Sequence, residues 1–234
     1  MEDPMTPKTV LLVGASRGLG FAIAEEYLKR GHRVIATGRA ASLERLRALA
    51  QGAAGALEVE TVDITDPAQV ADLRARLAQR RIDLLFVNAG VKNDDRETIA
   101  DVSTEEFTRV MVTNALSPMR VIEAFQDLVP PGGTIGIMSS GQGSLANATS
   151  AQYEVYRASK AALNMLMHMF AARHAGDPRP LLLMAPGWVK TDMGGADARL
   201  TIAESIPSLV ATIEAQAGRP GLQYLDYLGR TVPW

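Results

Sequence analysis

The sequence predicts an α/β fold in which one doubly wound, mostly parallel sheet carries helices on both faces. Short, nearly continuous apolar runs, which are typical of strands buried on both faces, alternate with longer helical stretches along the chain. Such alternation favours a parallel sheet covered by helices. The 234 residues are 47% hydrophobic, which is enough for one good core, and no linker or repeat divides them. We therefore expect a single domain over residues 1–234.

The composition excludes several classes of function. A net charge of -2 gives no broad basic surface, so we expect a small-molecule partner rather than nucleic acid or a membrane. The absence of cysteine excludes disulfides, thiolate metal sites and a cysteine nucleophile. The three histidines show no metal-ligand spacing, and we expect no metal. Residues 1–8 show no export signal, and no apolar run approaches the roughly 20 residues of a membrane span, so we expect a cytoplasmic protein.

The first predicted strand, Thr9–Val13, runs into a glycine-rich turn that opens a helix over residues 19–30. Glycines let the backbone of a tight turn approach a ligand, and a helix N-terminus offers free N–H groups to a phosphate. The spacing differs from the GxGxxG pattern, and an ordinary strand-to-helix turn is the alternative. Its position after the first strand favours a Rossmann-type nucleotide site. The residues of this turn that we expect to bind the cofactor are Gly14, Ser16, Arg17, Gly18, Leu19 and Gly20.

The second predicted strand, residues 34–37, is followed by Arg39. An NAD-binding domain usually places an acid here for the ribose 2'-hydroxyl, whereas an arginine suits a 2'-phosphate. Arg17 can reach the same phosphate. The sequence therefore predicts NADP(H) rather than NAD, with a solvated Arg39 as the alternative.

Two further strands end in small or polar residues. A strand over residues 57–62 is followed by Asp63 and Ile64, at the carboxyl end where open parallel sheets bind ligands. A strand over residues 83–87 runs into Asn88, Ala89 and Gly90, whose small side chains leave room for a flat ring or a ribose. Helices are predicted over residues 42–51 and, capped by Asp66 with Pro67 in its first turn, 66–80.

A proline interrupts the next predicted helix. A polar loop over residues 91–102 is followed by the capping-box pattern of Ser103 and Glu106, which opens a helix to about Val129. Pro118 has no N–H, so the carbonyl of Asn114, four residues earlier, loses its helical partner. We expect a bent helix whose free carbonyl holds a water, with a packing kink as the alternative.

The fifth predicted strand, residues 133–138, ends in Ser139 and Ser140. A helix over residues 150–172 then places Tyr156 and Lys160 on one face, one turn apart. A free phenol has a pKa of about 10, and a neighbouring cation lowers it, so this is a plausible acid/base pair. The alternative is an amphipathic helix with an exposed lysine. The remaining predicted elements are a strand over 181–184, a helix capped by Thr201 and Glu204 that ends near Gly218, and an edge strand with a tail over 222–234.

Taken in order, these residues resemble the short-chain dehydrogenases/reductases over nearly the whole chain. The matching positions are Gly14, Gly18, Gly20, Asp63, Asn88, Ala89, Gly90, Asn114, Ser140, Tyr156, Lys160, Pro186 and Gly187. Within this family, the chain most resembles the branch of the C-factor and the sniffer-type carbonyl reductases. The segments that carry this narrower resemblance are residues 156–164, 186–194 and 232–234.

The resemblance implies hydride transfer between NADPH and a carbonyl, with Tyr156 as proton donor and Ser140 orienting the carbonyl oxygen. Lys160 would hold the nicotinamide ribose and lower the pKa of Tyr156, and Asn114 would position a water. Val189 and Thr191 match positions that hydrogen-bond the nicotinamide carboxamide. The resemblance also implies a homodimer or homotetramer through the helices of residues 103–129 and 150–172. The apolar side chains on the second helix that suit either an interface or a core are Met165, Met167, Met169 and Phe170.

Two departures from the family pattern concern the tyrosine and the first turn. Ser140 precedes Tyr156 by sixteen positions, whereas much of the family has thirteen, which leads to Tyr153. Tyr153 is followed four residues later by Arg157 rather than by a lysine, so we assign the role to Tyr156 and expect a loop insertion. Ser139 and Ser144 are lesser candidates for the serine role. Val13 replaces a frequent threonine before the first glycine, which removes a hydroxyl that would brace the turn.

Two other functions fit the same features. One is an NADP-binding regulatory or signalling protein with little turnover, because a fold does not fix a function. The other is a reductase of substrates bound to acyl carrier protein, which predicts a basic patch beside the pocket. The loop over residues 91–101 is acidic overall, which argues against the second.

Overall fold

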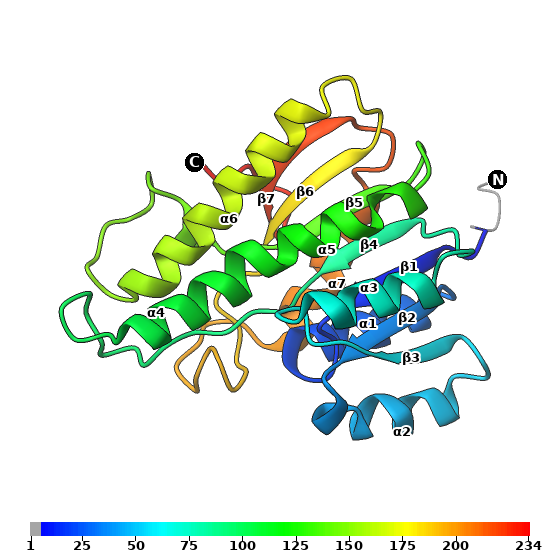
Figure 1. Cartoon of the computed structure of the whole chain (residues 1–234), viewed down its shortest axis with the longest axis horizontal. Coiled ribbons are helices and arrows are strands. Elements are labelled where there is room, and N and C mark those ends of the chain that lie inside the picture. The colour runs from blue at the N-terminus through cyan, green and yellow to red at the C-terminus, as the bar shows by residue number, and fades with distance from the viewer. Residues whose placement is uncertain (1–5) are drawn as a thin grey trace.

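A computed structural model of the chain describes residues 6–234 and contains one seven-stranded sheet (Figure 1). The strand order is β3-β2-β1-β4-β5-β6-β7, and every pairing is parallel. The order reverses between β1 and β4, which confirms the predicted doubly wound, Rossmann-type α/β fold. The strands are β1 Thr9–Val13, β2 Arg33–Gly38, β3 Leu57–Thr61, β4 Leu84–Val87, β5 Thr134–Met138, β6 Pro180–Ala185 and β7 Gly221–Asp226.

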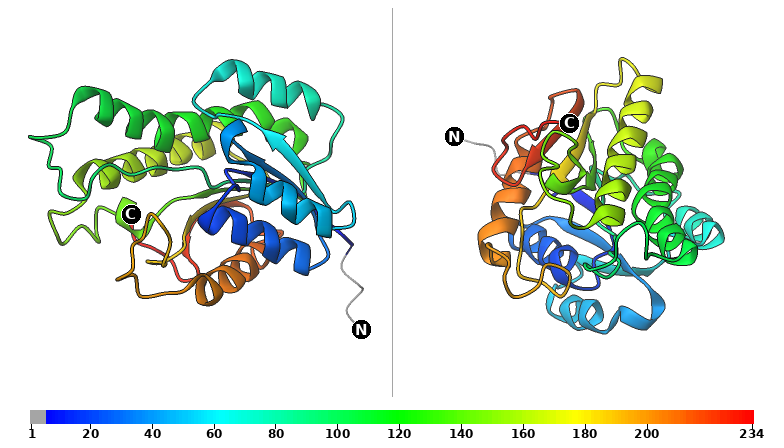
Figure 2. Two further views of the ribbon diagram at one scale, coloured as in Figure 1. Left: turned by 90° about the horizontal axis from the view of Figure 1, so that it is seen from below. Right: turned by 90° about the vertical axis from the view of Figure 1, so that its left-hand side faces the viewer.

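Helices cover both faces of the sheet, as Figure 2 shows from below. One face carries α3 Pro67–Arg76, α4 Thr104–Met111, α5 Ser117–Phe125 and α6 Glu154–Arg173. The other carries α1 Gly18–Lys29, α2 Glu44–Gly52 and α7 Ile202–Glu214. Three short 3-10 turns are η1 Ala40–Ser42, η3 Gln126–Leu128 and η4 Gly141–Gly143. Within residues 6–234, no helix is both long enough and apolar enough to cross a membrane.

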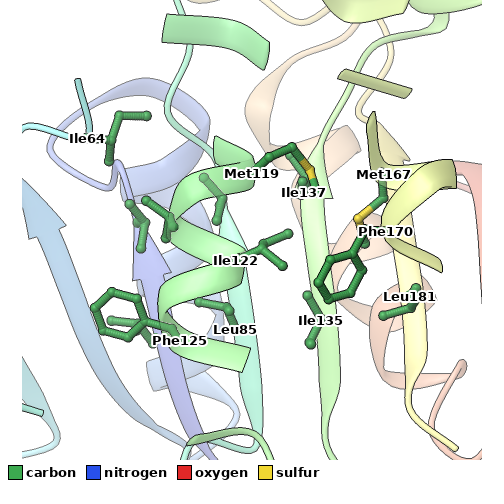
Figure 3. Packing of buried hydrophobic residues seen from close by; sticks show 14 of the residues in the cluster. Ile64, Leu85, Met119, Ile122, Phe125, Ile135, Ile137, Met167, Phe170 and Leu181 are labelled. Carbon is green, nitrogen blue, oxygen red and sulfur yellow. The ribbon is translucent and has the colours of Figure 1, made fainter. Parts of the chain in front are cut away.

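The core consists of two layers, one on each side of the sheet, because successive strand residues point to opposite faces. Figure 3 shows part of the first layer, in which Ile122 of α5 points toward Phe170 of α6 and Phe125 lies on the other side of α5. Beneath them lie strand side chains such as Leu85 and Ile135, all fully buried. The continuous apolar runs that predicted the strands therefore reflect burial on both faces.

Several predicted boundaries shift. The third helix ends at Arg76 rather than Arg80, and the last at Glu214 rather than near Gly218. The capping box of Thr201 and Glu204 is complete, with both reciprocal hydrogen bonds present. The predicted box at Ser103 is only half formed. The Ser103 hydroxyl accepts from the Glu106 N–H at 3.1 Å, but the Glu106 carboxylate binds Arg109 instead.

The predicted helix from Ser103 to Val129 is interrupted as expected, and the interruption is a π turn. This turn, η2 Val112–Leu116, lies between α4 and α5, and the Ser117 N–H bonds the carbonyl of Val112, five residues back. Pro118 lies in the first turn of α5, immediately after it. Because a π turn accommodates one extra residue, Asn114 is displaced from the regular helical ladder.

The helix that carries Tyr156 begins later than predicted, at Glu154 rather than Ser150. Tyr153 has a φ of 62°, in the left-handed region, which a non-glycine residue rarely adopts and which prevents the helix from extending further back. The Arg157 side chain bonds the carbonyl of Gln152 at 2.8 Å and the hydroxyl of Ser150 at 3.1 Å, and so ties the preceding loop to α6.

Candidate active site

Six strands, β1 to β6, end on the same side of the sheet, which we call the site edge (Figure 1). Most of the predicted site residues follow the carboxyl ends of these strands. This edge is where open α/β sheets bind ligands, on either side of the point where the strand order reverses. The residues that follow β1 to β6 respectively are Gly14, Arg39, Asp63, Asn88, Ser140 and Pro186.

The glycine turn after β1 is packed so closely that side chains do not fit. A Cβ atom on Gly20 would lie 2.2 Å from the carbonyl oxygen of Gly14. Gly14 has a φ of 87°, and a Cβ there would lie 2.6 Å from the backbone nitrogen of Ala89. The Asn88 amide donates to the Gly14 carbonyl at 2.8 Å. The turn is thereby fixed both to α1 and to the end of β4.

Thr37, in β2, supplies the hydroxyl that Val13 lacks. The Gly14 N–H donates to the Thr37 hydroxyl at 3.2 Å, and the Ala15 N–H donates to the Thr37 carbonyl at 2.7 Å. Thr37 is fully buried. The turn is therefore braced from the neighbouring strand, which leaves little cost for the valine.

The donors around the start of α1 suit a phosphate. Arg17 precedes the helix without a side-chain cap, and no acid lies in the first turn, so no capping side chain occupies the N-terminal N–H groups. Arg17 is exposed and lies 3.5 Å from the exposed Asp192 carboxylate, a geometry that contributes little stability. Arg39 is exposed and has no ion-pair partner within residues 6–234. Two guanidinium groups are thus available beside the turn.

Asp63 is held at the end of β3 by its own loop. One carboxylate oxygen accepts from the N–H and the hydroxyl of Thr65, at 2.9 and 2.7 Å. The Asp63 N–H donates to the Gln69 side chain at 2.9 Å. Ile64 is buried, so only the Asp63 side chain of this pair presents a polar group at the edge.

The Asn114 side chain fastens three segments together. Its oxygen accepts from the Val91 N–H at 2.8 Å, and its nitrogen donates to the Val91 carbonyl at 2.7 Å. The same nitrogen donates to the Ser159 hydroxyl at 2.9 Å, and that hydroxyl donates to the Tyr156 carbonyl at 2.7 Å. The π turn is thereby joined to the segment after β4 and to the first turns of α6.

Lys160 is buried beside Gly90. Its ammonium donates to the carbonyl of Met138, the last residue of β5, at 2.9 Å. A Cβ atom on Gly90 would lie 3.6 Å from the Lys160 nitrogen and 3.4 Å from the Asn114 oxygen. Burial disfavours the charged form and lowers the pKa of Lys160 to about 8.

Tyr156 lies next to Lys160, but its ionisation differs from the expectation. The lysine nitrogen is 5.9 Å from the centre of the phenol ring. Burial raises the pKa of Tyr156 to about 12, a hydrogen bond with the Ser140 hydroxyl opposes the rise, and Tyr224 adds to it. The expected lowering of this pKa by Lys160 is therefore wrong for these groups, because desolvation dominates and the ammonium is directed at the Met138 carbonyl.

The three candidate serines have different environments. Ser139 is buried, and its hydroxyl donates to the Asn164 side chain at 2.6 Å. Ser144 is buried, and its hydroxyl accepts from the Asn147 N–H at 3.1 Å. Ser140 is half-buried, and its hydroxyl accepts from the Gln142 N–H at 3.2 Å and also acts on the pKa of Tyr156. Of the three serines, only Ser140 affects the pKa of Tyr156.

Tyr153 lies outside this group. It precedes the first turn of α6, and the Lys92 nitrogen lies over its ring, 5.8 Å from the ring centre. Lys92 comes from the loop after β4 and pairs with Asp95 at 2.6 Å. Arg157, one turn beyond Tyr153, is bonded to the loop before the helix.

The segment after β6 folds back against the glycine turn. The Pro186 carbonyl accepts from the Ser205 hydroxyl at 2.7 Å, and Gly187 has a φ of 82°. Val189 is buried in a short bridge with Leu200. The Thr191 hydroxyl accepts from the Gly194 N–H at 3.0 Å, and its methyl group would lie 3.9 Å from a Cβ on Gly18. This segment therefore borders the start of α1.

The family model for the short chain dehydrogenases matches residues 8–199. The chain belongs to this family. A short-chain dehydrogenase/reductase structure from Burkholderia multivorans with bound NADP is 57% identical, covers 98% of this chain and 100% of that chain, and has a TM-score of 0.96. A carbonyl reductase from Pseudomonas aeruginosa PAO1 in complex with NADP is 38% identical, with coverage of 98% and 100% and a TM-score of 0.90.

The narrower resemblance to the C-factor and sniffer branch is confirmed by two of these similarities. The C-signal protein of Myxococcus xanthus is 34% identical over 155 residues, which are 65% of this chain and 93% of that protein. The carbonyl reductase Sniffer of D. melanogaster is 26% identical, covers 98% of this chain and 100% of that chain, and has a TM-score of 0.85.

Sequence reasoning missed four residues of this short-chain dehydrogenase site: Thr37, Ser159, Asn164 and Tyr224. Asn164 lies four residues after Lys160, on the same face of α6, and this spacing was a usable signal. It bonds Ser139 and also donates to the Gly143 carbonyl at 3.2 Å. Tyr224 bonds the Ser140 carbonyl from a strand 84 residues further on, and no local pattern indicates it.

Proposed function

We propose that the protein is an NADP(H)-dependent carbonyl reductase, which transfers a hydride between the nicotinamide and a ketone or aldehyde. The observation that carries the proposal is the meeting of Tyr156, Ser140 and Lys160 beside Gly90, at the edge that also carries the glycine turn. A phenol, a hydroxyl and an ammonium beside an open glycine are the groups that such a reduction needs.

The cofactor would be held by the residues already predicted for it. The glycine turn and the start of α1 would bind the phosphates, and Arg17 and Arg39 the 2'-phosphate. Asp63, with the turn from Asn88 to Gly90 and the segment from Pro186 to Thr191, would border the remainder. When bound, NADPH supplies the hydride that reaches the carbonyl carbon. The NADP in the two similar structures supports this assignment.

The chain itself supplies the proton. With its pKa raised to about 12, Tyr156 stays protonated at neutral pH and can donate to the oxygen of the substrate. The Ser140 hydroxyl, which acts on that phenol, orients the same oxygen. Lys160, buried one turn along α6, holds the ribose side of the site. Asn114 keeps α6 and the Gly90 turn in fixed relation, and its backbone carbonyl would hold the water that resupplies the proton.

Oxidation of NADPH in the presence of ketones, aldehydes and quinones tests the proposal. We expect turnover with at least one of these carbonyls. We expect Tyr156→Phe to keep NADPH binding and to lose activity about 100-fold or more, because proton transfer contributes at least that factor. Tyr153→Phe is the matched control and should lose much less. The reverse order of the two variants would reassign the catalytic tyrosine, and NADPH binding without oxidation above background would refute the enzyme.

That last outcome favours the second candidate, an NADP-binding regulatory or signalling protein. The similarity to the C-signal protein supports this candidate. Against it stands the complete set of polar groups around Tyr156, since a protein that only binds NADP needs no proton donor there.

The substrate we propose is an apolar carbonyl compound rather than a protein-bound one. Three large apolar side chains on the loops at the site edge are exposed: Leu145, Trp188 and Met193. The loop over residues 91–101 carries four acids and two bases. An acidic loop repels acyl carrier protein if, as we assume, the carrier is itself acidic, whereas apolar side chains favour burial of an apolar substrate.

We also propose a homodimer or homotetramer through α6 and the adjoining helices. Met167 and Phe170 belong to the core, but Met165, Leu166 and Met169 expose 60%, 40% and 46% of their surface. Residues at these spacings lie on one side of a helix, and such an apolar face is typical of an interface.

A further inference from the structure

We propose that Tyr224 is a positioning residue for Ser140, acting through the serine backbone on the hydroxyl that faces the substrate. The inference rests on the proposed function in one respect, because Ser140 must orient a reacting carbonyl. Tyr224 lies in β7, at the edge of the sheet, and is separated from the Ser140 strand by β6.

The hydroxyl of Tyr224 donates a hydrogen bond to the backbone carbonyl of Ser140. The same carbonyl accepts from the Gly143 N–H at 2.9 Å, so both of its lone pairs are occupied. Tyr224 is only 2% exposed, and burial raises its pKa, which keeps the hydroxyl protonated and therefore a donor. The carbonyl of Ser140 lies beyond the last residue of β5 and receives nothing from the sheet ladder.

The residues on either side of Ser140 are also held by α6, which packs on the same face of the sheet as Tyr224. Lys160 bonds the Met138 carbonyl, and Asn164 bonds both the Ser139 hydroxyl and the Gly143 carbonyl. A Cβ on Gly143 would lie 3.0 Å from Lys160, so the turn rests directly on the helix. Without the Tyr224 bond, the Ser140 carbonyl would keep only the bond from the Gly143 N–H, and its peptide would be less restrained.

The ring of Tyr224 is itself fixed by the segment that follows β7. That segment turns back in an antiparallel bridge between Leu225 and Thr231, and the Val232 N–H bonds the Tyr224 carbonyl at 2.8 Å. The Trp234 ring centre lies 5.3 Å from that of Tyr224, and the Trp234 backbone oxygen accepts from the Ala146 N–H at 3.0 Å. The tyrosine is therefore held against the loop that begins at Ser140.

Tyr224→Phe tests the proposal, because it removes one oxygen and keeps the ring packed on Trp234. We expect kcat to fall about tenfold, as one lost hydrogen bond implies, with the KM for NADPH unchanged. Tyr27→Phe is the matched control, since Tyr27 is also buried and its hydroxyl has no partner within residues 6–234. It should leave kcat unchanged. An unaltered kcat in Tyr224→Phe would overturn the proposal.

A double-mutant cycle shows whether Tyr224 acts by positioning the Ser140 hydroxyl or by stabilising the site in general. In a Ser140→Ala background, Tyr224→Phe should cost almost nothing further in single-turnover rate, because the hydroxyl to be positioned is gone. An equal loss in both backgrounds would show that Tyr224 acts elsewhere and would refute the inference.

Amide hydrogen exchange over residues 141–146 tests the same contact without turnover. We expect exchange to be faster in Tyr224→Phe than in the original protein and unchanged in Tyr27→Phe. If no carbonyl is reduced but exchange responds, the contact stands and the proposed function fails. If turnover is found but exchange and kcat are unchanged, only the inference about Tyr224 fails.

Discussion

At the scale of single residues, burial has opposite effects on the two titratable groups of the site. Both Tyr156 and Lys160 lose water, which favours the neutral form of each and moves the pKa of the phenol up and that of the ammonium down. A phenol with a raised pKa is a weaker acid, and it stays protonated at neutral pH.

Arg39 tests the cofactor assignment at this scale. Replacing it with alanine should weaken NADPH binding about 10- to 100-fold, because hydrogen bonds to a charged phosphate contribute about 1.5–3 kcal/mol. NADH, which has no 2'-phosphate, should bind as before. Fluorescence titration with NADPH and with NADH measures the ratio of the two dissociation constants. Arg45→Ala, whose guanidinium stacks on Phe21 nearby, is the control, and an unchanged ratio in Arg39→Ala would rule out the 2'-phosphate role.

At the scale of elements, the glycine turn explains how α1 can pack so close to the ends of β1 and β4. The first turn of the helix touches the carbonyl of Gly14 and the amide of Asn88 without intervening side chains. Thr37 and Asn88 then complete the bonding of the turn from both neighbouring strands. The cofactor end of the site is thus built by three adjacent strands and one helix.

Gly20→Ala should disrupt this contact. Its Cβ would fall 2.2 Å from backbone oxygen, and overpacking of this kind costs about 1–3 kcal/mol in the free energy of unfolding. NADPH binding should weaken as α1 moves. Gly52→Ala is the control, because a Cβ there meets nothing within 4 Å, and it should raise stability by about 0.4–1 kcal/mol. Urea titration measures the free energy of unfolding of both variants. Equal values for Gly20→Ala and Gly52→Ala would contradict the close-packing argument.

At the scale of the whole molecule, the sheet gathers residues from distant parts of the chain. Gly14 and Tyr224 belong to the first and last strand regions, yet both lie at the same edge because every strand runs in the same direction. The outer face of α6 exposes two methionines, Met165 and Met169.

Met169→Glu tests the assembly. A charge on the apolar face of α6 should shift the protein to a smaller species in sedimentation velocity, because burying an unpaired carboxylate is costly. Met169→Leu keeps the apolar character and should sediment like the original protein. If Met169→Glu leaves the sedimentation coefficient unchanged, the interface lies elsewhere.

The fold class, the positions of the site residues at strand ends and the family could all be predicted from the sequence. Apolar runs predict buried strands, and strand ends predict which residues meet, because both depend on local spacing. Gly14, Arg39, Asn88 and Ser140 all lie where that reasoning placed them. Their catalytic and binding roles stay predictions.

The direction of the Tyr156 pKa shift and the contacts that hold Ser140 depend on the tertiary structure. A pKa depends on the balance of burial and neighbouring charge, and spacing along a helix reveals the charge but not the loss of water. Thr37 and Tyr224 reach the site across strand neighbours far away in sequence. The π turn likewise follows from packing, since Pro118 predicts an interruption but not its form.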